Sequence, residues 1–294
     1  MRSHSPSRTA EYMALFRAVE SAEPPRRRLF EDPYAVALLR GALKALAEFA
    51  RWPIAGRTVS AFLDLGWPST RSSGVVRTRM IDDLVRDAIA RGARQLVLLG
   101  AGFDSRAFRL PEARTLAVFE VDHPATQKAK LERLARLGPP PANISFVEAD
   151  FERDHLDGLL CQAGFDRSTP AAVVWEGVVS YLTAAAVEAN LSLLARLLAP
   201  SSRLVFTYVD KAALDGSASF HGAWRWKSWV RFRGEPFLFG FDPATLAGHL
   251  CSHGFRLESD CSTAEGAAFY CAPHGRKESG SPMYRVAAAL RVGD

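Results

Sequence analysis

Hydrophobic positions follow two different patterns along the chain, and the change comes near residue 93. In the first part, apolar residues recur every three or four positions, which is the spacing of amphipathic helices. This spacing predicts three helices, over residues 5–20, 34–50 and 75–91. We therefore expect residues 1–92 to form a helical N-terminal cap that lies over the rest of the molecule.

Particular residues set the expected ends of these helices. Asp32 and Pro33 have the order of a helix cap followed by a proline in the first turn, so we expect the second helix to open there. Trp52-Pro53 should close it, and Gly92 should end the third helix. Residues 54–73 show no regular period, and we expect this stretch to be less regular.

From residue 94 onward, short apolar runs alternate with segments of helical spacing. This alternation is typical of an α/β fold in which helices cover both faces of a mostly parallel sheet. We predict seven strands, the last pair antiparallel, in a core over residues 93–294. The expected strands are 95–99, 115–121, 144–149, 172–175, 203–209, 255–260 and 284–291, and the expected helices are 123–137, 154–163, 183–198 and 243–253.

An aromatic-rich segment, residues 211–241, breaks the alternation with three tryptophans and five phenylalanines. A connection of this length is commonly an active-site lid. We expect it near the mouth of the sheet, either as the lining of an apolar pocket or as an aromatic core beneath a lid. The residues considered for the pocket are Trp224, Trp226, Trp229, Phe232 and Phe237, with Arg225 and Arg231 available for an anion.

Composition and charge narrow the class of protein. The 294 residues are 48% hydrophobic and 23% charged, which is ordinary for a globular protein. A net charge of +5 would suit nucleic acid, but most arginines are scattered and paired with acids, so no nucleic-acid partner is predicted. The chain starts without an apolar leader and has no run long enough to span a bilayer. We therefore expect a cytoplasmic protein without a membrane partner.

The cysteines and histidines form no pattern typical of disulfides or of a metal site. The four cysteines include no C-x-x-C pair, so free thiols in a reducing compartment are expected. One group near the C-terminus has the residue types of a zinc site, but its spacings match no standard ligand pattern. We therefore predict no metal; that group consists of Cys251, His253, Cys261, Cys271 and His274.

The chain is organised around the stretch QLVLLGAGFDSRAFRL, residues 95–110. Its predicted strand stops at Gly100 and Gly102, where a missing Cβ lets a ligand approach the backbone and allows a sharp turn into a helix. Ser105 stands where a dinucleotide-binding motif would carry a third glycine. This departure argues against a nicotinamide-dependent oxidoreductase, which is the alternative from another enzyme class.

Acidic residues end the next three predicted strands. Ligands of open α/β sheets bind beyond the carboxyl ends of the strands, so these acids should share one crevice with the glycines. Asp122, or its neighbour Glu120, can accept both hydroxyls of a ribose. Asp150 can accept an exocyclic amine beside the apolar face of Phe151, and Glu176 follows the fourth strand. Taken singly, Asp122 or Asp150 is as easily a helix N-cap, but together the acids indicate a site for an adenosine compound without a diphosphate.

Four motifs in register carry a resemblance to a known family. LGAGFDSRAFRL, FEVDHP, EADFERD and WEGVVSYL resemble the leucine carboxyl methyltransferase family, most closely its bacterial branch of S-adenosylmethionine-dependent O-methyltransferases, which includes polyketide-modifying enzymes. The likeness runs from about Ser7 to Asp294 and is strongest from Val76 to Leu182. It implies a Rossmann-like class I methyltransferase fold with S-adenosylmethionine as cofactor.

The resemblance also implies roles for residues of the cap and the first loop. Arg77 matches the family arginine that reaches from the cap to the methionyl carboxylate of the cofactor, and an arginine fork suits that group. Arg79 is close enough in the sequence to compete for this role. Gly100 matches the glycine that lies against the cofactor, and Gly102 belongs to the same turn.

Further roles are implied at the ends of the later strands. Asp122 matches the acid near the ribose, with Glu120 as the nearby alternative. Asp150 and Phe151 match the pair at the adenine, where the family more often carries leucine in place of Phe151. Glu176 matches the glutamate close to the amino-acid end of the cofactor. The leucine-to-phenylalanine difference keeps an apolar contact with the adenine.

The expected reaction is an in-line transfer of a methyl group from sulfur to oxygen, for which the cofactor carries the difficult chemistry. Tyr181 falls where the family has a tyrosine facing the methyl group. A carboxylate acceptor is already anionic at neutral pH, whereas a phenol would need a base, for which His221 is the candidate. We predict an O-methyltransferase for a small natural-product molecule, anionic and aromatic, with a carboxyl acceptor slightly favoured. The alternative with the same chemistry is methylation of a protein C-terminal carboxyl group.

Overall fold

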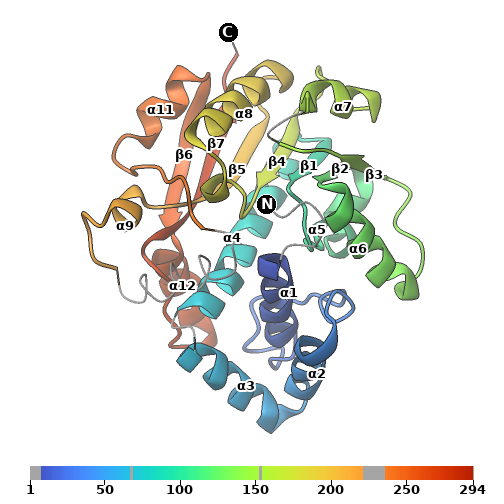
Figure 1. Cartoon of the computed structure of the whole chain (residues 1–294), viewed down its shortest axis with the longest axis vertical. Helices are drawn as coiled ribbons and strands as arrows, with labels where there is room; N and C mark the ends of the chain where they lie inside the picture. Colours follow the sequence, from blue (N-terminus) through green and yellow to red (C-terminus); the bar gives the residue numbers. More distant parts are fainter. Residues whose placement is uncertain (1–7, 67–68, 152–153, 221–235, 294) are drawn as a thin grey trace.

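The computed structural model describes residues 8–66, 69–151, 154–220 and 236–293. The N-terminal part is helical, as the hydrophobic spacing predicts. Its helices are α1 (Arg8–Ser21), α2 (Gly41–Ala50), α3 (Pro53–Gly66) and α4 (Thr70–Ala90). They occupy the lower part of the view in Figure 1, from which α4 runs up onto the sheet. None of the described helices is long and apolar enough to cross a membrane.

The predicted helix start at Asp32 and Pro33 is wrong. Residues 33–38 form turns, and the helix begins only at Gly41. The Asp32 carboxylate is buried, and it accepts hydrogen bonds from Arg17 Nε (2.8 Å) and Ser105 Oγ (2.6 Å). Asp32 therefore ties the N-terminal helices to the loop after the first strand, which a local reading of the sequence does not reveal.

The prediction of a less regular stretch over residues 54–73 is also wrong. Helix α3 fills most of it, and α4 begins at Thr70. Pro53 stands at the first position of α3, so it starts a helix as well as following the end of α2. Proline suits that position because the first helical residues have no intrahelical partner for an N–H group.

The seven predicted strands form one sheet in the order β3-β2-β1-β4-β5-β7-β6. β7 is antiparallel to both of its neighbours, and the other pairs are parallel. The order reverses between β1 and β4, which creates the switch point at which α/β sheets bind ligands. The strands are β1 (Gln95–Leu99), β2 (Ala117–Asp122), β3 (Ile144–Glu148), β4 (Ala171–Trp175), β5 (Arg203–Val209), β6 (Phe255–Ser262) and β7 (Tyr284–Arg291).

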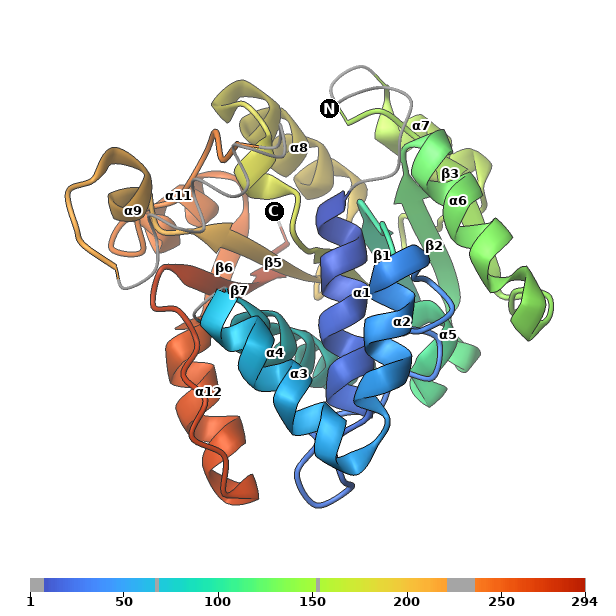
Figure 2. The ribbon, with the colours of Figure 1, turned by 60° about the horizontal axis from the view of Figure 1, so that its bottom comes forward.

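Alternate residues of each strand face two separate apolar cores. Leu96 and Leu98 of β1 belong to the core that includes the N-terminal helices, and Val97 and Leu99 belong to the core on the other face. Figure 2 shows α1 and α4 together on one side of the sheet. The first face also carries α5 (Arg106–Arg109), α6 (Pro124–Leu134) and α12 (Thr263–Cys271), and the second carries α7 (Leu156–Gln162), α8 (Ala184–Leu197) and α11 (Leu246–Ser252).

The N-terminal helices and the sheet share one of these cores. Buried residues of α1, α2 and α4 form a continuous apolar cluster with those of β1, β2 and β4. Contact clusters of this kind usually mark one core per domain. The division of the chain at residue 92 into a cap and a core stays a prediction.

Helix α12, between β6 and β7, was not predicted. Its start is a capping box: Ser262 Oγ accepts the Glu265 N–H (3.2 Å), and the Glu265 carboxylate accepts the Ser262 N–H (2.7 Å). The helix packs closely on α4, because a Cβ added to Gly266 would collide with Met80 and Val76. The S-x-x-E spacing of this box is a signal that the sequence does carry.

Candidate functional site

The loop after β1 makes the sharp turn that its glycines predict. Gly100 has φ +65° and Gly102 has φ +48°, a region that favours glycine. The N–H groups of Gly100 and Ala101 both donate to the carbonyl oxygen of Val121, at 2.8 and 3.0 Å. A Cβ on Gly100 would collide with Val178 Cγ2. The first loop therefore lies tightly between the ends of β2 and β4, at the switch point of the sheet.

The two acids at the end of β2 have different surroundings. Both carboxylate oxygens of Glu120 bind Lys130 Nζ, at 2.8 and 2.7 Å, and both side chains are almost fully buried. Burial raises the pKa of Glu120 to about 6, although Lys130 favours the charged form. The Asp122 carboxylate instead accepts hydrogen bonds from the N–H groups of Gly102 and His123. Asp122, and not Glu120, thus lies against the glycine loop.

Burial also raises the pKa of Asp122, and the hydrogen bonds from Gly102 and His123 oppose this shift. Asp122 is only 8% exposed. Each of its two oxygens accepts a hydrogen bond from one backbone N–H group, Oδ2 from Gly102 and Oδ1 from His123. A ligand hydroxyl at this carboxylate would meet acceptor atoms whose positions the backbone has already fixed.

Glu176, directly after β4, is held by two arginines from two different helices. Arg77 Nε of α4 donates to Glu176 Oε1 (2.7 Å), and Arg106 Nη1 of α5 donates to Glu176 Oε2. Burial disfavours the charged form of Glu176, but Arg106 and Arg77 together outweigh it and lower its pKa. The guanidinium of Arg77 also lies 5.0 Å from the centre of the Tyr284 ring, on β7. Glu176 is therefore kept as a carboxylate.

Arg106 is the residue that sequence reasoning missed. It is 2% exposed, and besides Glu176 it binds the carboxylates of Asp104 and Asp82. Burial opposes ionisation of Asp104, but the cations around it, Arg106 first and Arg17 next, lower the pKa of Asp104. Arg106 lies inside the motif LGAGFDSRAFRL, which is the signal that could have found it. Its partners, however, come from distant parts of the chain.

Arg77 and Arg79 were both considered for the same role in the sequence, and only Arg77 reaches the ends of the strands. Arg79 pairs with Asp83 (3.0 Å) and donates to the carbonyl oxygen of Leu29 (2.7 Å). Its guanidinium lies 5.4 Å from the centre of the Tyr270 ring, on α12. Arg79 thus points into the helical layer, away from Glu176.

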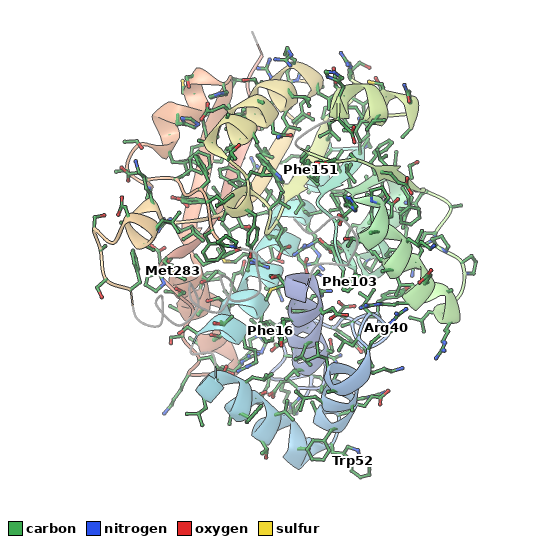
Figure 3. All side chains as sticks on the ribbon, viewed as in Figure 1. Phe16, Arg40, Trp52, Phe103, Phe151 and Met283 are labelled. Atoms are coloured by element: carbon green, nitrogen blue, oxygen red, sulfur yellow. The ribbon has the colours of Figure 1, made fainter. Side chains whose placement is uncertain are left out.

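The remaining predicted residues lie around the same edge of the sheet. Asp150 and Phe151 follow β3, and Phe151 packs against the core of the second face. Figure 3 labels Phe151 above Phe103, which belongs to the loop after β1. Tyr181 ends a short turn after β4, and its ring centre lies 5.4 Å from that of Phe237.

His221 lies outside the described residues, so the predicted general base has no position in this structure. The same holds for most of the aromatic segment. Phe237, near its C-terminal end, is described and contacts Tyr181. The other predicted pocket residues outside the described ranges are Trp224, Arg225, Trp226, Trp229, Arg231 and Phe232.

The structure thus brings the predicted residues into two contacting groups. Gly102 and Asp122 form one group, and Arg77 and Glu176 form the other. The loop from Gly102 to Arg106 connects them, because Arg106 is bonded to Glu176. The arrangement offers a carboxylate for hydroxyl groups at one end and a guanidinium for an anion at the other.

Comparison with known proteins agrees with the motifs. Residues 10–195 match the model of the family described as "Leucine carboxyl methyltransferase". A Mycobacterium sp. (strain KMS) protein named "Putative S-adenosyl-L-methionine-dependent methyltransferase" is 32% identical over 283 residues, with 87% of this chain and 86% of that protein covered. A Mycobacterium tuberculosis protein of the same name is 38% identical over 194 residues, or 64% and 60% of the two chains.

Solved structures support the fold. A protein from Thermobifida fusca, described as a "putative methyltransferase", superposes with a TM-score of 0.58 at 17% identity, over 94% of this chain and 97% of that chain. A DUF574 family protein from Streptomyces avermitilis superposes with a TM-score of 0.54 at 15% identity, over 93% and 99%. The sheet order and these neighbours agree with the predicted Rossmann-like class I methyltransferase fold.

Proposed function

The chain belongs to the leucine carboxyl methyltransferase family and is an S-adenosylmethionine-dependent methyltransferase, and from this premise we propose that it methylates an oxygen atom of a small molecule. A carboxyl group is our first choice of acceptor. One observation carries the proposal: the loop from Gly102 to Arg106 joins the Asp122 carboxylate to the pair formed by Arg77 and Glu176. These contacts support a site at the strand ends in which one loop adjoins both a carboxylate for hydroxyl groups and a guanidinium for a carboxylate.

We assign the donors and acceptors around this loop to parts of the cofactor. Asp122 would take the ribose hydroxyls, and the sharp turn at Gly100 and Gly102 would present the loop backbone to the nucleoside. Asp150 and Phe151 would meet the adenine from the end of β3.

Arg77 would take the carboxylate at the amino-acid end. An arginine has five N–H donors, and the bond to Glu176 uses the Nε donor of Arg77. Glu176 would keep Arg77 oriented and would accept from the ammonium group of the cofactor.

The protein's contribution to the reaction is positioning. The bound cofactor supplies an electrophilic methyl group, and the accepting oxygen must be held about 3 Å from the methyl carbon, in line with the sulfur and away from water. A carboxylate needs no general base because it is ionised at neutral pH. We propose that Tyr181, at the edge of the aromatic segment, orients the acceptor, and that His221 would serve as base for a phenol.

Cofactor binding tests the assignment of the site. Calorimetry with S-adenosylhomocysteine should show that Asp122→Ala and Arg77→Ala each weaken binding by about 10- to 100-fold. The first variant loses a charged hydrogen-bond acceptor and the second a charged donor. Arg79→Ala is the matched control, because Arg79 faces the helical layer, and it should bind within about threefold of the parent. NAD should not bind. Equal binding by the Asp122 variant and the parent would show that Asp122 does not hold the ribose.

The acceptor requires a separate experiment. Small aromatic acids, phenols and peptides with a free C-terminal carboxylate would be incubated with enzyme and cofactor, and mass spectrometry would detect one added methyl group. Mild alkali cleaves a methyl ester and leaves an aryl ether intact, so it separates carboxyl from phenol acceptors. Methylation of the peptide alone, or of nitrogen alone, would overturn the proposal of a small-molecule O-methyltransferase.

A further inference from the structure

Two histidines and a glutamate meet on the second face of the sheet. His249 of α11 and His253, which follows that helix, are four residues apart and so lie on one side of it. Their Nε2 atoms lie 3.1 and 3.0 Å from the two carboxylate oxygens of Glu188, on α8. All three ligand atoms lie within 4.8 Å of one another, and within the described ranges this is the only cluster of its kind.

The surroundings of the His253 ring suit a metal ligand. The carbonyl oxygen of His249 lies 3.0 Å from His253 Nδ1, and a carbonyl only accepts. A proton on Nδ1 would make this hydrogen bond and would leave the Nε2 lone pair of a neutral ring facing the Glu188 carboxylate, 3.0 Å away. Such a pair of acceptors needs a cation between them, either a proton on Nε2 or a metal ion. Metal-binding histidines commonly have such a carbonyl behind them.

The His249 ring supplies a second indication. Its Nε2 atom is shielded from solvent and makes no hydrogen bond of acceptable geometry within the described part of the chain, although Glu188 lies beside it. A buried polar nitrogen without a hydrogen-bond partner is costly. Coordination would satisfy it.

This cluster is separate from the candidate methyl-transfer site. Glu188, His249 and His253 belong to helices that cover the second face, whereas Arg77 reaches the strand ends from α4 on the first face. In Figure 1, α8 and α11 lie side by side at the top of the molecule, away from the N-terminal helices. The inference below therefore does not depend on the proposed function.

We propose that Glu188, His249 and His253 bind one divalent transition-metal ion, Zn²⁺ in the first place, which ties α11 to α8. Two imidazoles and one carboxylate are a ligand set for zinc, whereas calcium and magnesium prefer oxygen ligands. Ligand atoms around a tetrahedral Zn²⁺ are about 3.4 Å apart, which follows from bond lengths near 2.1 Å. The imidazole nitrogens lie 3.1 and 3.0 Å from two different oxygens of the Glu188 carboxylate, and one ligand atom of each residue lies within 4.8 Å of the other two, so a small shift of the side chains would bring three ligand atoms to this spacing.

The ion could enter from solvent and keep an open position. The Glu188 side chain is 44% exposed, and His253 also lines a cavity of about 700 Å³ between α8 and the turn before β6. Three protein ligands leave the fourth position of a tetrahedral ion to water. The sequence led us to expect no metal, because the spacings of the cysteines and histidines near the C-terminus match no standard ligand pattern. Glu188, some sixty residues earlier in the chain, was not among the ligands considered.

Metal titration of the tag-free, chelator-treated protein tests the proposal. We expect one Zn²⁺ per chain by calorimetry, and a tetrahedral visible spectrum when Co²⁺ is used instead. His253→Ala and Glu188→Gln should each weaken Zn²⁺ binding by at least about tenfold. Zn²⁺ should also raise the melting temperature of the parent and leave those of the two variants unchanged.

Two matched controls separate this site from adventitious binding. Cys251 is an exposed thiol between the two histidines in the sequence, and His274 is a half-buried imidazole next to the carbonyl oxygen of Arg26. Cys251→Ser and His274→Ala should bind Zn²⁺ like the parent. The proposal is wrong if Cys251→Ser abolishes binding, if His253→Ala and Glu188→Gln bind like the parent, or if the parent binds no Zn²⁺. Affinity for S-adenosylhomocysteine should be the same with and without Zn²⁺.

Discussion

At the carboxyl end of β2, the buried carboxylate of Glu120 faces a single cation, Lys130, whereas at the carboxyl end of β4 the carboxylate of Glu176 faces both Arg77 and Arg106. Burial prevails at the first position and raises the pKa of Glu120 to about 6. At the second position the two arginines prevail over burial, and the pKa of Glu176 is lowered. Two neighbouring cations thus outweigh burial and favour the charged carboxylate, whereas one cation does not.

The difference separates a structural acid from a candidate ligand-binding acid. The side chains of Glu120 and Lys130 are each 1% exposed, so this pair is closed to ligands and fixes α6 to the sheet. The Glu176 side chain is 16% exposed and is ionised at the edge where the cofactor is proposed to lie. Asp122, two residues beyond Glu120, is the acid at the end of β2 that contacts the glycine loop.

The largest effect is expected from Arg106→Met. This substitution would leave the carboxylates of Glu176, Asp104 and Asp82 without their shared cation in a buried site. Breaking a buried ion pair by removing one partner costs about 3–5 kcal/mol. Urea denaturation at pH 7.5 would measure the loss in the free energy of unfolding, since urea does not screen charges.

Arg91→Met is the control for this prediction. Arg91 also pairs with an aspartate, Asp87, but its side chain is 64% exposed. An exposed ion pair contributes at most about 1 kcal/mol, so this variant should be close to the parent. Similar losses for Arg106→Met and Arg91→Met would show that the cluster at β4 does not stabilise the fold as proposed.

A smaller effect is expected from Glu176→Gln. The amide keeps the size of the side chain but leaves Arg77 and Arg106 facing each other without a negative charge between them. We expect the free energy of unfolding at pH 7.5 to fall by about 2 kcal/mol, the range for losing a hydrogen-bonded charge. The measurement is again urea denaturation, and stability equal to that of the parent would contradict a lowered pKa for Glu176.

Much of the fold could be predicted because its signals are local. The bounds of β1, β5 and β7 coincide with the apolar runs at 95–99, 203–209 and 284–291. Helix α12 carried a local signal too, the S-x-x-E capping box, which the sequence reading did not use. Asp32 does accept the Tyr34 N–H (3.0 Å) as a cap would, but the turns at 33–38 do not continue into a helix, and its other oxygen binds Arg17.

Less of the candidate site could be predicted, because its contacts join distant residues. The sequence placed acids at the ends of β2, β3 and β4, and the sheet brings these ends to one edge. It could not show that Lys130 closes off Glu120, or that Arg106 and Glu176, seventy positions apart, share a bond. These pairings depend on how the helices cross the strand ends. Periodicity does not specify that crossing.

The smallest change at pH 7.5 is expected from Glu120→Gln, and its pH dependence tests the comparison between the strand ends. The amide removes the cost of burying a charged carboxylate, but it leaves the buried Lys130 with only an amide oxygen as acceptor. Because these two effects oppose each other, we expect the free energy of unfolding to change by no more than about 1 kcal/mol. The pKa of Glu120 is raised from 4.5 to about 6, so its contribution to stability is complete below 4.5 and is lost as the pH rises through 6. Between pH 7.5 and 4.5 the parent should therefore gain up to about 2 kcal/mol over Glu120→Gln.

The advantage of the parent over Glu176→Gln should instead stay level down to about pH 4.5 and then shrink, because the pKa of Glu176 is lowered. Urea denaturation across this range would measure both differences, and the same trend for the two variants would mean that the ends of β2 and β4 do not differ electrostatically.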